Sequence, residues 1–274
     1  MLSVNTNVGA MIALQYLNQT NSDLMETQSR INSGLRVSSP KDNGAVFAIA
    51  QSMRGKVSGY AAVADSLNRG VSTVDVAISA GTSISDLLNE LKAKALAAAD
   101  ASLDTASRSA LNADFTALRD QITTIVQNAS FNGTNLVDGT TANIQALASD
   151  DGTKKITATG QNLKLSGAIV TVKSTSTIST VAKASTMVST INTSIQNVNA
   201  ALAKLAAGSK KFEIQNDFVA RLVDTLKAGI GNLVDADMAV ESARLQSLQV
   251  RQQLGVQALS IANAAPAITL SLFR

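Results

Sequence analysis

Apolar side chains recur near the start of the chain at alternating spacings of three and four residues. The apolar positions are Leu14, Leu17, Leu24 and Ile31, and polar Asn21 and Gln28 stand at the intervening heptad positions. Heptad spacing is typical of a helix that pairs with another helix along one seam. Residues 1–38 are therefore predicted to form a coiled-coil helix. The turn-forming segment 38–44, which contains Pro40, should end this helix at about residue 38.

Three further helices are predicted from apolar residues at helical spacing. The first run covers residues 67–95, and the second covers residues 111–125, before the turn dipeptide Asn132-Gly133. Helical spacing resumes over residues 187–233.

The chain changes character between residues 134 and 184, where Thr, Val, Ser and Gly replace Ala and Leu. Alternating stretches at 155–159 and 168–172 stand beside the turn dipeptides Asp151-Gly152 and Ser166-Gly167. Such alternation next to turn formers is typical of β-hairpins. The predicted fold is mainly α, with long helical hairpins, a coiled coil from paired N- and C-terminal segments, and a small β-hairpin region in the middle.

The last segment, residues 236–274, has apolar residues on more than one side of a helix. One stripe contains Val250, Leu254, Ala258, Ile261, Ala265, Ile268 and Leu272, and another side carries Leu245, Leu248, Val256 and Leu259. Helices that are apolar on several faces are usually buried. At the end of a chain, such a helix is covered only by the fold or by a partner. We therefore expect the two ends to pair and to pack against further copies of the chain.

The predicted assembly interface collects the largest of these apolar residues. It consists of Leu14, Leu17, Leu24, Ile31, Leu245, Leu248, Leu254, Leu259, Ile261, Ile268 and Leu272.

The composition narrows the chemistry that the chain can perform. It contains no Cys, no His and no Trp, and aromatic residues make up only 3%. Thiolate and imidazole are the usual ligands of zinc, copper and haem, and His is the commonest acid-base group near neutral pH. We expect no enzyme activity, no metal site and no cofactor, although carboxylate or Ser-Lys chemistry stays formally open.

Two local patterns imitate ligand sites. Gly229-x-Gly231 lacks the preceding strand and the Lys-Ser/Thr of a phosphate loop, so a role in packing or helix flexing is favoured. Asp235, Asp237 and Glu241 are spaced so that they do not share one helical face. An exposed acidic helix start is therefore favoured over a cation site.

Charge and hydropathy argue against nucleic-acid and membrane partners. The net charge of +3 is small for 274 residues, and the basic residues are scattered, whereas nucleic-acid binders usually show a basic stripe. No apolar run approaches transmembrane length, and the first basic residue is Arg30, so the start lacks the basic region of a secretory signal. We expect a soluble chain that, if it is secreted, uses another route.

Three blocks of the sequence resemble bacterial flagellins. They are residues 29–55, residues 130–139 (Ser-Phe-Asn-Gly-Thr-Asn-Leu-Val-Asp-Gly), and residues 234–274, with Asp-Ala-Asp at 235–237 and a terminal Leu-Ser-Leu-Phe-Arg. The blocks stand in the family's order and at its distances from the chain ends. The resemblance implies a structural subunit that is exported unfolded through the flagellar export apparatus, with a secretion chaperone. It would then polymerise at the filament tip and enable motility.

The resemblance also implies further partners and a division of the chain. The partners would be copies of the chain itself, other flagellins, the filament cap and the hook-junction proteins. Residues 1–38 and 236–274 would form two halves of a terminal coiled-coil domain, and residues 39–235 an inner helical domain with the β region at 134–184. Because that middle has only about fifty residues, the outer variable domains of longer flagellins are expected to be absent.

A Ser- and Thr-rich segment near the end of the middle region allows two interpretations. It is either an exposed β segment with a linker or, by resemblance to many flagellins, a site of O-glycosylation. The candidate residues are Thr171, Ser174, Thr175, Ser176, Thr177, Ser179 and Thr180.

Three other assignments compete with a filament subunit. A hook-filament junction protein shares the helical ends but would be present as about one ring instead of thousands of copies. A flagellin with an inserted protease domain would need a His-Glu-x-x-His motif, and the chain has no His. A secreted coiled-coil adhesin or effector would not appear as the main component of sheared surface filaments.

Overall fold

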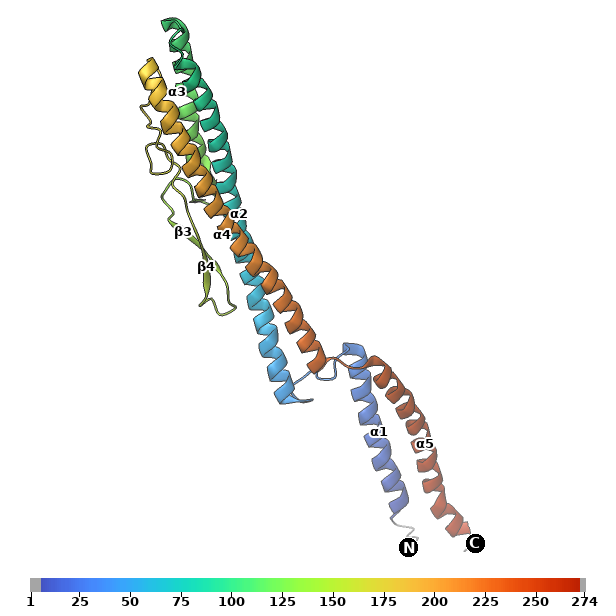
Figure 1. The fold of residues 1–274 in the computed structure, drawn as a ribbon. Helices are drawn as coiled ribbons and strands as arrows, with labels where there is room; N and C mark the ends of the chain where they lie inside the picture. Colours follow the sequence, from blue (N-terminus) through green and yellow to red (C-terminus); the bar gives the residue numbers. More distant parts are fainter. Residues whose placement is uncertain (1–5, 272–274) are drawn as a thin grey trace. The chain divides into compact units, whose positions relative to one another are not determined.

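The chain is mainly helical, as predicted. The computed structural model describes the backbone of residues 6–271 and the side chains of residues 6–264. In this part the chain forms five helices and four short strands (Figure 1). The helices are α1 (Val8–Ser33), α2 (Gly44–Ala98), α3 (Thr105–Asn128), α4 (Val181–Val234) and α5 (Met238–Ser271), and the strands are β1 (Ser130–Phe131), β2 (Thr134–Asn135), β3 (Asn143–Leu147) and β4 (Lys155–Thr159).

Internal contacts divide the chain into two compact units. The first unit contains Met1–Gly55 and Thr225–Arg274, and the second contains Lys56–Asp224. The first unit therefore holds α1, α5 and the adjoining ends of α2 and α4. The second holds the rest of α2 and α4 together with α3 and the strands.

The predicted end of the first helix, at about residue 38, is wrong. Helix α1 ends at Ser33, because Gly34 adopts the left-handed conformation with φ 70° and its N–H donates to the Arg30 carbonyl at 2.8 Å. The turn-forming residues 38–43 lie in the connection that leads into α2. Asn43 Oδ1 accepts a hydrogen bond from the Val46 N–H at 3.1 Å, as a helix N-cap does.

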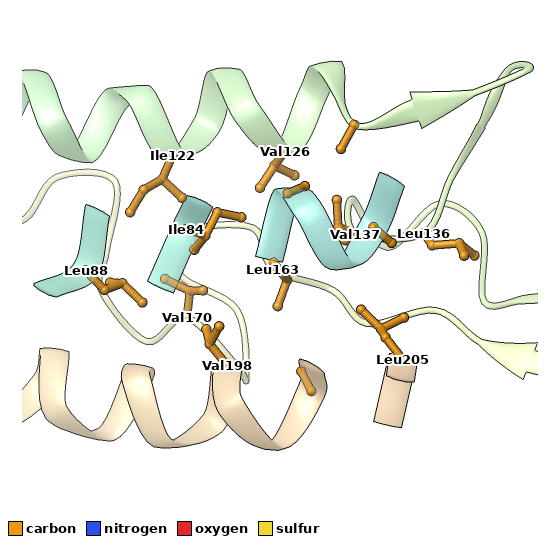
Figure 2. Close-up of a cluster of buried hydrophobic side chains, with 14 of the residues drawn as sticks. Ile84, Leu88, Ile122, Val126, Leu136, Val137, Leu163, Val170, Val198 and Leu205 are labelled. Carbon is orange, nitrogen blue, oxygen red and sulfur yellow. The ribbon is translucent and has the colours of Figure 1, made fainter. Parts of the chain in front are cut away.

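The core of the second unit is built by α2, α3 and α4 together with the segments that flank the strands. Figure 2 shows side chains of the three helices and these segments converging on one cluster. Its labelled members, each 0 or 1% exposed, are Ile84, Leu88, Ile122, Val126, Leu136, Val137, Leu163, Val170, Val198 and Leu205. The apolar spacing that predicted these helices therefore marks their buried faces.

One of the two predicted β stretches pairs as a strand. Strands β3 and β4 form an antiparallel hairpin in which Asn143 lies opposite Thr159 and Leu147 lies opposite Lys155. The turn between them contains Gly152 at φ 70°. The strand predicted at 155–159 is confirmed, and its partner is a segment that the alternation of apolar and polar residues did not reveal.

The strand predicted at 168–172 is wrong. Val170 forms an isolated bridge to Leu165, while Val170 and Val172 are both buried in the helical core. Between them, the Thr171 N–H donates to Ser194 Oγ of α4 at 3.0 Å. The alternation at 168–172 therefore reflects a loop that inserts Val170 and Val172 into the core and binds α4 through Thr171.

Small residues let the β3–β4 hairpin approach the helices closely. A Cβ atom added at Gly208 of α4 would lie 3.0 Å from the Cβ of Ala158. One added at Gly59 of α2 would lie 2.9 Å from the Cβ of Asp150. Within the second unit, the hairpin is therefore packed against α4 at its strands and against α2 near its tip.

The block at residues 130–139 forms the turn and loop that follow α3. Asn132 and Gly133 both have positive φ, 49° and 78°, as a tight turn between the paired strands β1 and β2 requires. Asn135 is buried, and its Nδ2 donates to the Val126 carbonyl at 2.7 Å while its Oδ1 accepts from the Val137 N–H at 2.9 Å. This side chain satisfies an α3 carbonyl and orients the loop that follows.

Candidate assembly interface

Helices α1 and α5 lie side by side as an antiparallel pair (Figure 1). Three polar contacts run along the pair. Arg30 bonds Glu241, Asn21 Oδ1 accepts from Gln252 Nε2 at 2.7 Å, and Asn7 Nδ2 donates to the Ala262 carbonyl at 2.6 Å. The α5 residue number rises as the α1 number falls, which is the pairing of the two ends that the sequence predicted.

Each helix turns a heptad seam toward the other. The less exposed positions include Ala10, Ala13, Leu17, Thr20, Leu24, Thr27 and Ile31 on α1, and Glu241, Leu245, Leu248, Gln252, Gly255, Leu259 and Ala262 on α5. Both sets alternate spacings of three and four, as a coiled coil requires. A Cβ atom at Gly255 would lie 3.3 Å from Leu17 Cδ1, so the two helices approach closely at that point.

The predicted interface residues fall into two groups. Leu17, Leu24, Ile31, Leu245, Leu248 and Leu259 lie on the seam between the helices, half-buried or buried. Leu14, Leu254 and Ile261 are exposed, at 47%, 57% and 73%. The side chain of Ile268 and the whole of Leu272 lie outside the described residues.

Few apolar side chains in this pair are fully covered. Among the described residues of α1 and α5, the one buried apolar side chain is Leu248. The exposed large apolar residues are Val8, Met11, Ile12, Leu14, Tyr16 and Met25 on α1, and Met238, Val240, Val250, Leu254, Val256 and Ile261 on α5. Exposed apolar surface on this scale is typical of a site of protein–protein contact.

The acidic residues at the start of α5 have different roles. The Asp237 carboxylate accepts hydrogen bonds from the N–H groups of Ala239 and Val240 at 2.9 and 3.2 Å, so it caps the helix. The prediction of an exposed acidic helix start fits Asp237 but is wrong for Glu241, which is buried. Arg30 explains the difference, because its guanidinium reaches Glu241 from α1.

The segment between α1 and α2 pairs with the segment between α4 and α5. The N–H groups of Arg36 and Val37 donate to the Val234 carbonyl at 2.7 and 3.2 Å, and the Ala236 N–H donates to the Gly34 carbonyl at 2.9 Å. Val37 and Val234 are buried together in a small apolar cluster with Ala50. Parts of the first and third sequence blocks therefore meet in space.

Gly229 lies where a larger residue would make only an ordinary contact with α2, so the role of Gly229 in packing or helix flexing stays a prediction. A Cβ atom added at Gly229 would lie 3.4 Å from Met53 Cε of α2.

In the residues that the structure describes, no group of three or more acidic side chains is arranged to hold a metal ion. The same described helices include none that is long and apolar enough to span a membrane.

The Ser- and Thr-rich segment is a loop that is partly engaged by its surroundings. The Thr171 hydroxyl lies 3.2 Å from the Thr190 carbonyl and 2.9 Å from Ser194 Oγ, and Thr171 is half-buried. Ser176 and Thr177 are half-buried as well. The exposed members are Ser174, Thr175, Ser179 and Thr180.

Comparison with known families identifies both helical regions. Residues 4–142 match the family described as the bacterial flagellin N-terminal helical region. Residues 188–273 match the bacterial flagellin C-terminal helical region. The two matches include α1 and α5 and omit residues 143–187, which contain the whole Ser- and Thr-rich loop.

Relatives match over almost the whole chain. Flagellin FljM and flagellin FljK of Caulobacter vibrioides are each 52% identical over 272 residues, covering 99% of this chain and 98% of theirs. A flagellin of Brucella melitensis is 37% identical over 296 residues and covers 100% of both chains. This chain therefore belongs to the bacterial flagellins, the non-enzymatic structural subunits of the extracellular flagellar filament that serves motility.

Proposed function

We propose that the α1–α5 pair has two apolar faces with separate roles in the filament. Leu17, Leu24, Ile31, Leu245, Leu248 and Leu259 join the two helices within one subunit, and Leu14, Leu254 and Ile261 contact neighbouring subunits. By sequence spacing, Ile268 and Leu272 extend the second face. The observation that carries this proposal is the exposed apolar stripe on the side of α5 that faces away from α1. A self-contained coiled coil carries polar residues there.

The division of the chain follows from these roles. Residues 1–38 and 236–274 act as the terminal coiled-coil domain, and residues 39–235 act as the inner helical domain. The second unit, Lys56–Asp224, has a core of its own from α2, α3 and α4 and lies within this inner domain, whereas residues 39–55 and 225–235 belong to the same compact unit as α1 and α5. The β region at 134–184 belongs to the inner domain.

The terminal helices are proposed to fold only when subunits assemble. Ordering a helix costs conformational entropy at every residue, and apolar burial has to offset that cost. In the described part of α1 and α5, Leu248 is the one apolar side chain that the pair buries. Neighbouring subunits would cover the exposed stripe and complete the burial. Before assembly, the unfolded ends would be the segments that a secretion chaperone and the flagellar export apparatus hold.

Limited proteolysis tests this proposal. In a subunit shown to be monomeric, protease should remove both ends and leave a stable core of about residues 40–235, which contains the compact unit Lys56–Asp224. Intact filaments should resist, and the trimmed core should not polymerise. Protease-resistant ends in the monomer, or filaments grown from the trimmed core, would contradict it.

Further partners follow from membership of the family. The chain would meet the filament cap at the growing tip, the hook-junction proteins at the base, and other flagellins within the same filament. Mass spectrometry of sheared filaments measures the share of each flagellin. If this chain were present at only about one ring of copies per filament, a role as a hook-filament junction protein would be favoured instead.

We also propose O-glycosylation within the Ser- and Thr-rich loop, at its accessible residues. Ser174 and Thr175 are exposed, whereas the hydroxyl of Thr171 is engaged by α4. Intact mass measurement of the filament protein detects the added sugar. The quadruple variant Ser174→Ala/Thr175→Ala/Ser179→Ala/Thr180→Ala, which removes every exposed hydroxyl of the candidate set, should lose it, and Thr171→Ala should keep it. An unmodified native mass would refute glycosylation.

A further inference from the structure

The exposed side of α1 carries two hollows of the same construction. Both are shallow, open grooves on the surface of this one helix: Met11, Leu14, Gln15, Asn18 and Gln19 line one, and Met25, Gln28, Ser29, Asn32 and Ser33 line the other. In each, the first four residues stand at i, i+3, i+4 and i+7. This is the quartet that receives one side chain of a facing helix in knobs-into-holes packing.

The spacing and chemistry of the two hollows restrict what can fill them. Met11 and Met25 stand 14 residues apart, as do Asn18 and Asn32. This is two heptads, or about 21 Å at 1.5 Å per residue. None of the lining residues is charged. A helix that docks here therefore needs two uncharged knobs on one face, two heptads apart.

Helix α5 carries such a pair of knobs. Val240 and Leu254 are 60% and 57% exposed. Of the six exposed large apolar side chains in the described part of α5, these two form the one pair that is 14 residues apart. Leu254 stands two residues beyond Gln252 of the seam, which is about 200° around a helix of 3.6 residues per turn. It therefore points away from the α1 of its own chain.

We infer that Leu254 and Val240 of one subunit insert into the two hollows on α1 of a second subunit. Leu254 enters the hollow at Met11–Asn18, and Val240 enters the hollow at Met25–Asn32. The two helices then run antiparallel, as they do within the chain. This inference rests on the proposed function, in which copies pack through these helices, and it names the surfaces that meet.

The inferred contact has the symmetry that a polymer requires. The knobs belong to α5 and the hollows to α1, so each subunit offers one surface of each kind. A contact between two different surfaces continues from copy to copy, whereas a contact between identical surfaces closes a dimer. Each α5 would then lie between its own α1 and the α1 of a neighbour.

Cysteine pairs test the inference directly, because the native chain has no Cys. The matched variants are Gln15→Cys/Leu254→Cys and Ser29→Cys/Val240→Cys. The crossed variants, Gln15→Cys/Val240→Cys and Ser29→Cys/Leu254→Cys, use the same four positions in the wrong register. Disulfides form only where the two Cβ atoms come within about 4.5 Å. Oxidised filaments of the matched variants should give ladders of cross-linked multimers, and those of the crossed variants should stay monomeric.

The controls separate this contact from assembly in general. Each variant is checked for filaments by electron microscopy. A variant that forms none alone is co-assembled with native subunits and scored by cross-linked dimers. Filaments without cross-links in the matched variants would overturn the inferred docking and leave the proposed assembly role intact. Ladders in the crossed variants would overturn it too. Dimers from Leu254→Cys alone would show that α5 meets a second α5, which also contradicts the inference.

Discussion

Nη1 of Arg30 lies 3.1 Å from Oε1 of Glu241, across the α1–α5 pair. Glu241 is only 6% exposed, and its second carboxylate oxygen has no hydrogen-bond partner among the described residues. Arg30 also bonds Glu26 on its own helix. Because a buried carboxylate without a cation is costly, this contact favours one register of the two helices over its neighbours.

Removing Arg30 should weaken the filament more than removing both charges. Breaking a fully buried ion pair costs about 3 to 5 kcal/mol, and less is expected here because the Arg30 side chain is 22% exposed. Arg30→Ala should lower the temperature at which filaments depolymerise, followed by light scattering. Arg30→Ala/Glu241→Gln should recover part of the loss. A double variant that is no better than Arg30→Ala would show that the ion pair does not matter to the pairing.

Arg108 should stabilise the second unit by closing the end of α2. Its guanidinium donates to three carbonyls, those of Ala98, Asp100 and Leu103, at 3.0, 2.9 and 3.0 Å. Hydrogen bonds to a charged group contribute about 1.5 to 3 kcal/mol. Arg108→Ala should lower the free energy of unfolding of the soluble subunit by this order, measured by urea titration. Arg69→Ala, at an exposed position of α2, is the control and should change it little.

The sequence predicted where the helices lie along the chain, but it predicted less accurately which residues of each helix face its partner. Heptad spacing placed Leu17, Leu24 and Ile31 on the seam of α1, where they lie. It also placed Leu14 there, although the structure turns Ala13 inward and leaves Leu14 exposed. A small seam residue carries little hydrophobic signal, so the pattern selects the larger neighbour.

Other features depend on partners that are distant in the sequence. The burial of Glu241 depends on Arg30, 211 residues away. The seam of α5 includes Gln252 and Gly255, which no apolar pattern would select; they fit because Asn21 and Leu17 of α1 face them. The pattern of α5 did show two apolar sides. Which of them faces α1 is decided by the side chains that α1 presents.

Glycine should be required at position 208 and not at position 55. Gly208 faces Ala158 of the hairpin, whereas no atom lies within 4 Å of a Cβ added at Gly55. Both lie inside helices, where Ala is favoured over Gly by about 1 kcal/mol. Gly55→Ala should therefore stabilise the soluble subunit against urea. Gly208→Leu should destabilise it and speed cleavage of the hairpin by protease. Equal stabilisation by both substitutions would contradict the close packing of β4 on α4.

Stability of the hairpin tip should fall at acid pH. Hydrogen bonds, first from the Ser149 hydroxyl and then from the Thr153 N–H and hydroxyl, lower the pKa of Asp151 to about 2 from 3.8. A lowered pKa in the folded state means that the carboxylate stabilises the fold above pH 3.8, and that this contribution disappears as the pH falls through about 2. Asp151→Asn should be less stable than the native chain at pH 7, and the difference should vanish below about pH 2. Thermal midpoints across this range measure it, with Asp86→Asn as the exposed control.

An insertion at the hairpin tip should be tolerated where one in the Ser- and Thr-rich loop is not. The residues after Gly152 at the hairpin tip are exposed. The strands are anchored away from the tip, where Ala158 of β4 packs against Gly208 of α4. The insertion gives up the hydrogen bonds from Thr153 to Asp151, and the added loop length itself costs only about 0.6 kcal/mol per doubling. In the other loop, the Ser176 carbonyl accepts from Arg119 Nη1 at 2.7 Å, and Ile178 is fully buried. A Gly-Ser-Gly-Ser insertion after Gly152 should still give filaments by electron microscopy, whereas the same insertion after Ser176 should lower the thermal midpoint of the subunit and reduce filament yield. A folded subunit that loses filaments only with the Gly152 insertion would place the hairpin tip in a contact between subunits.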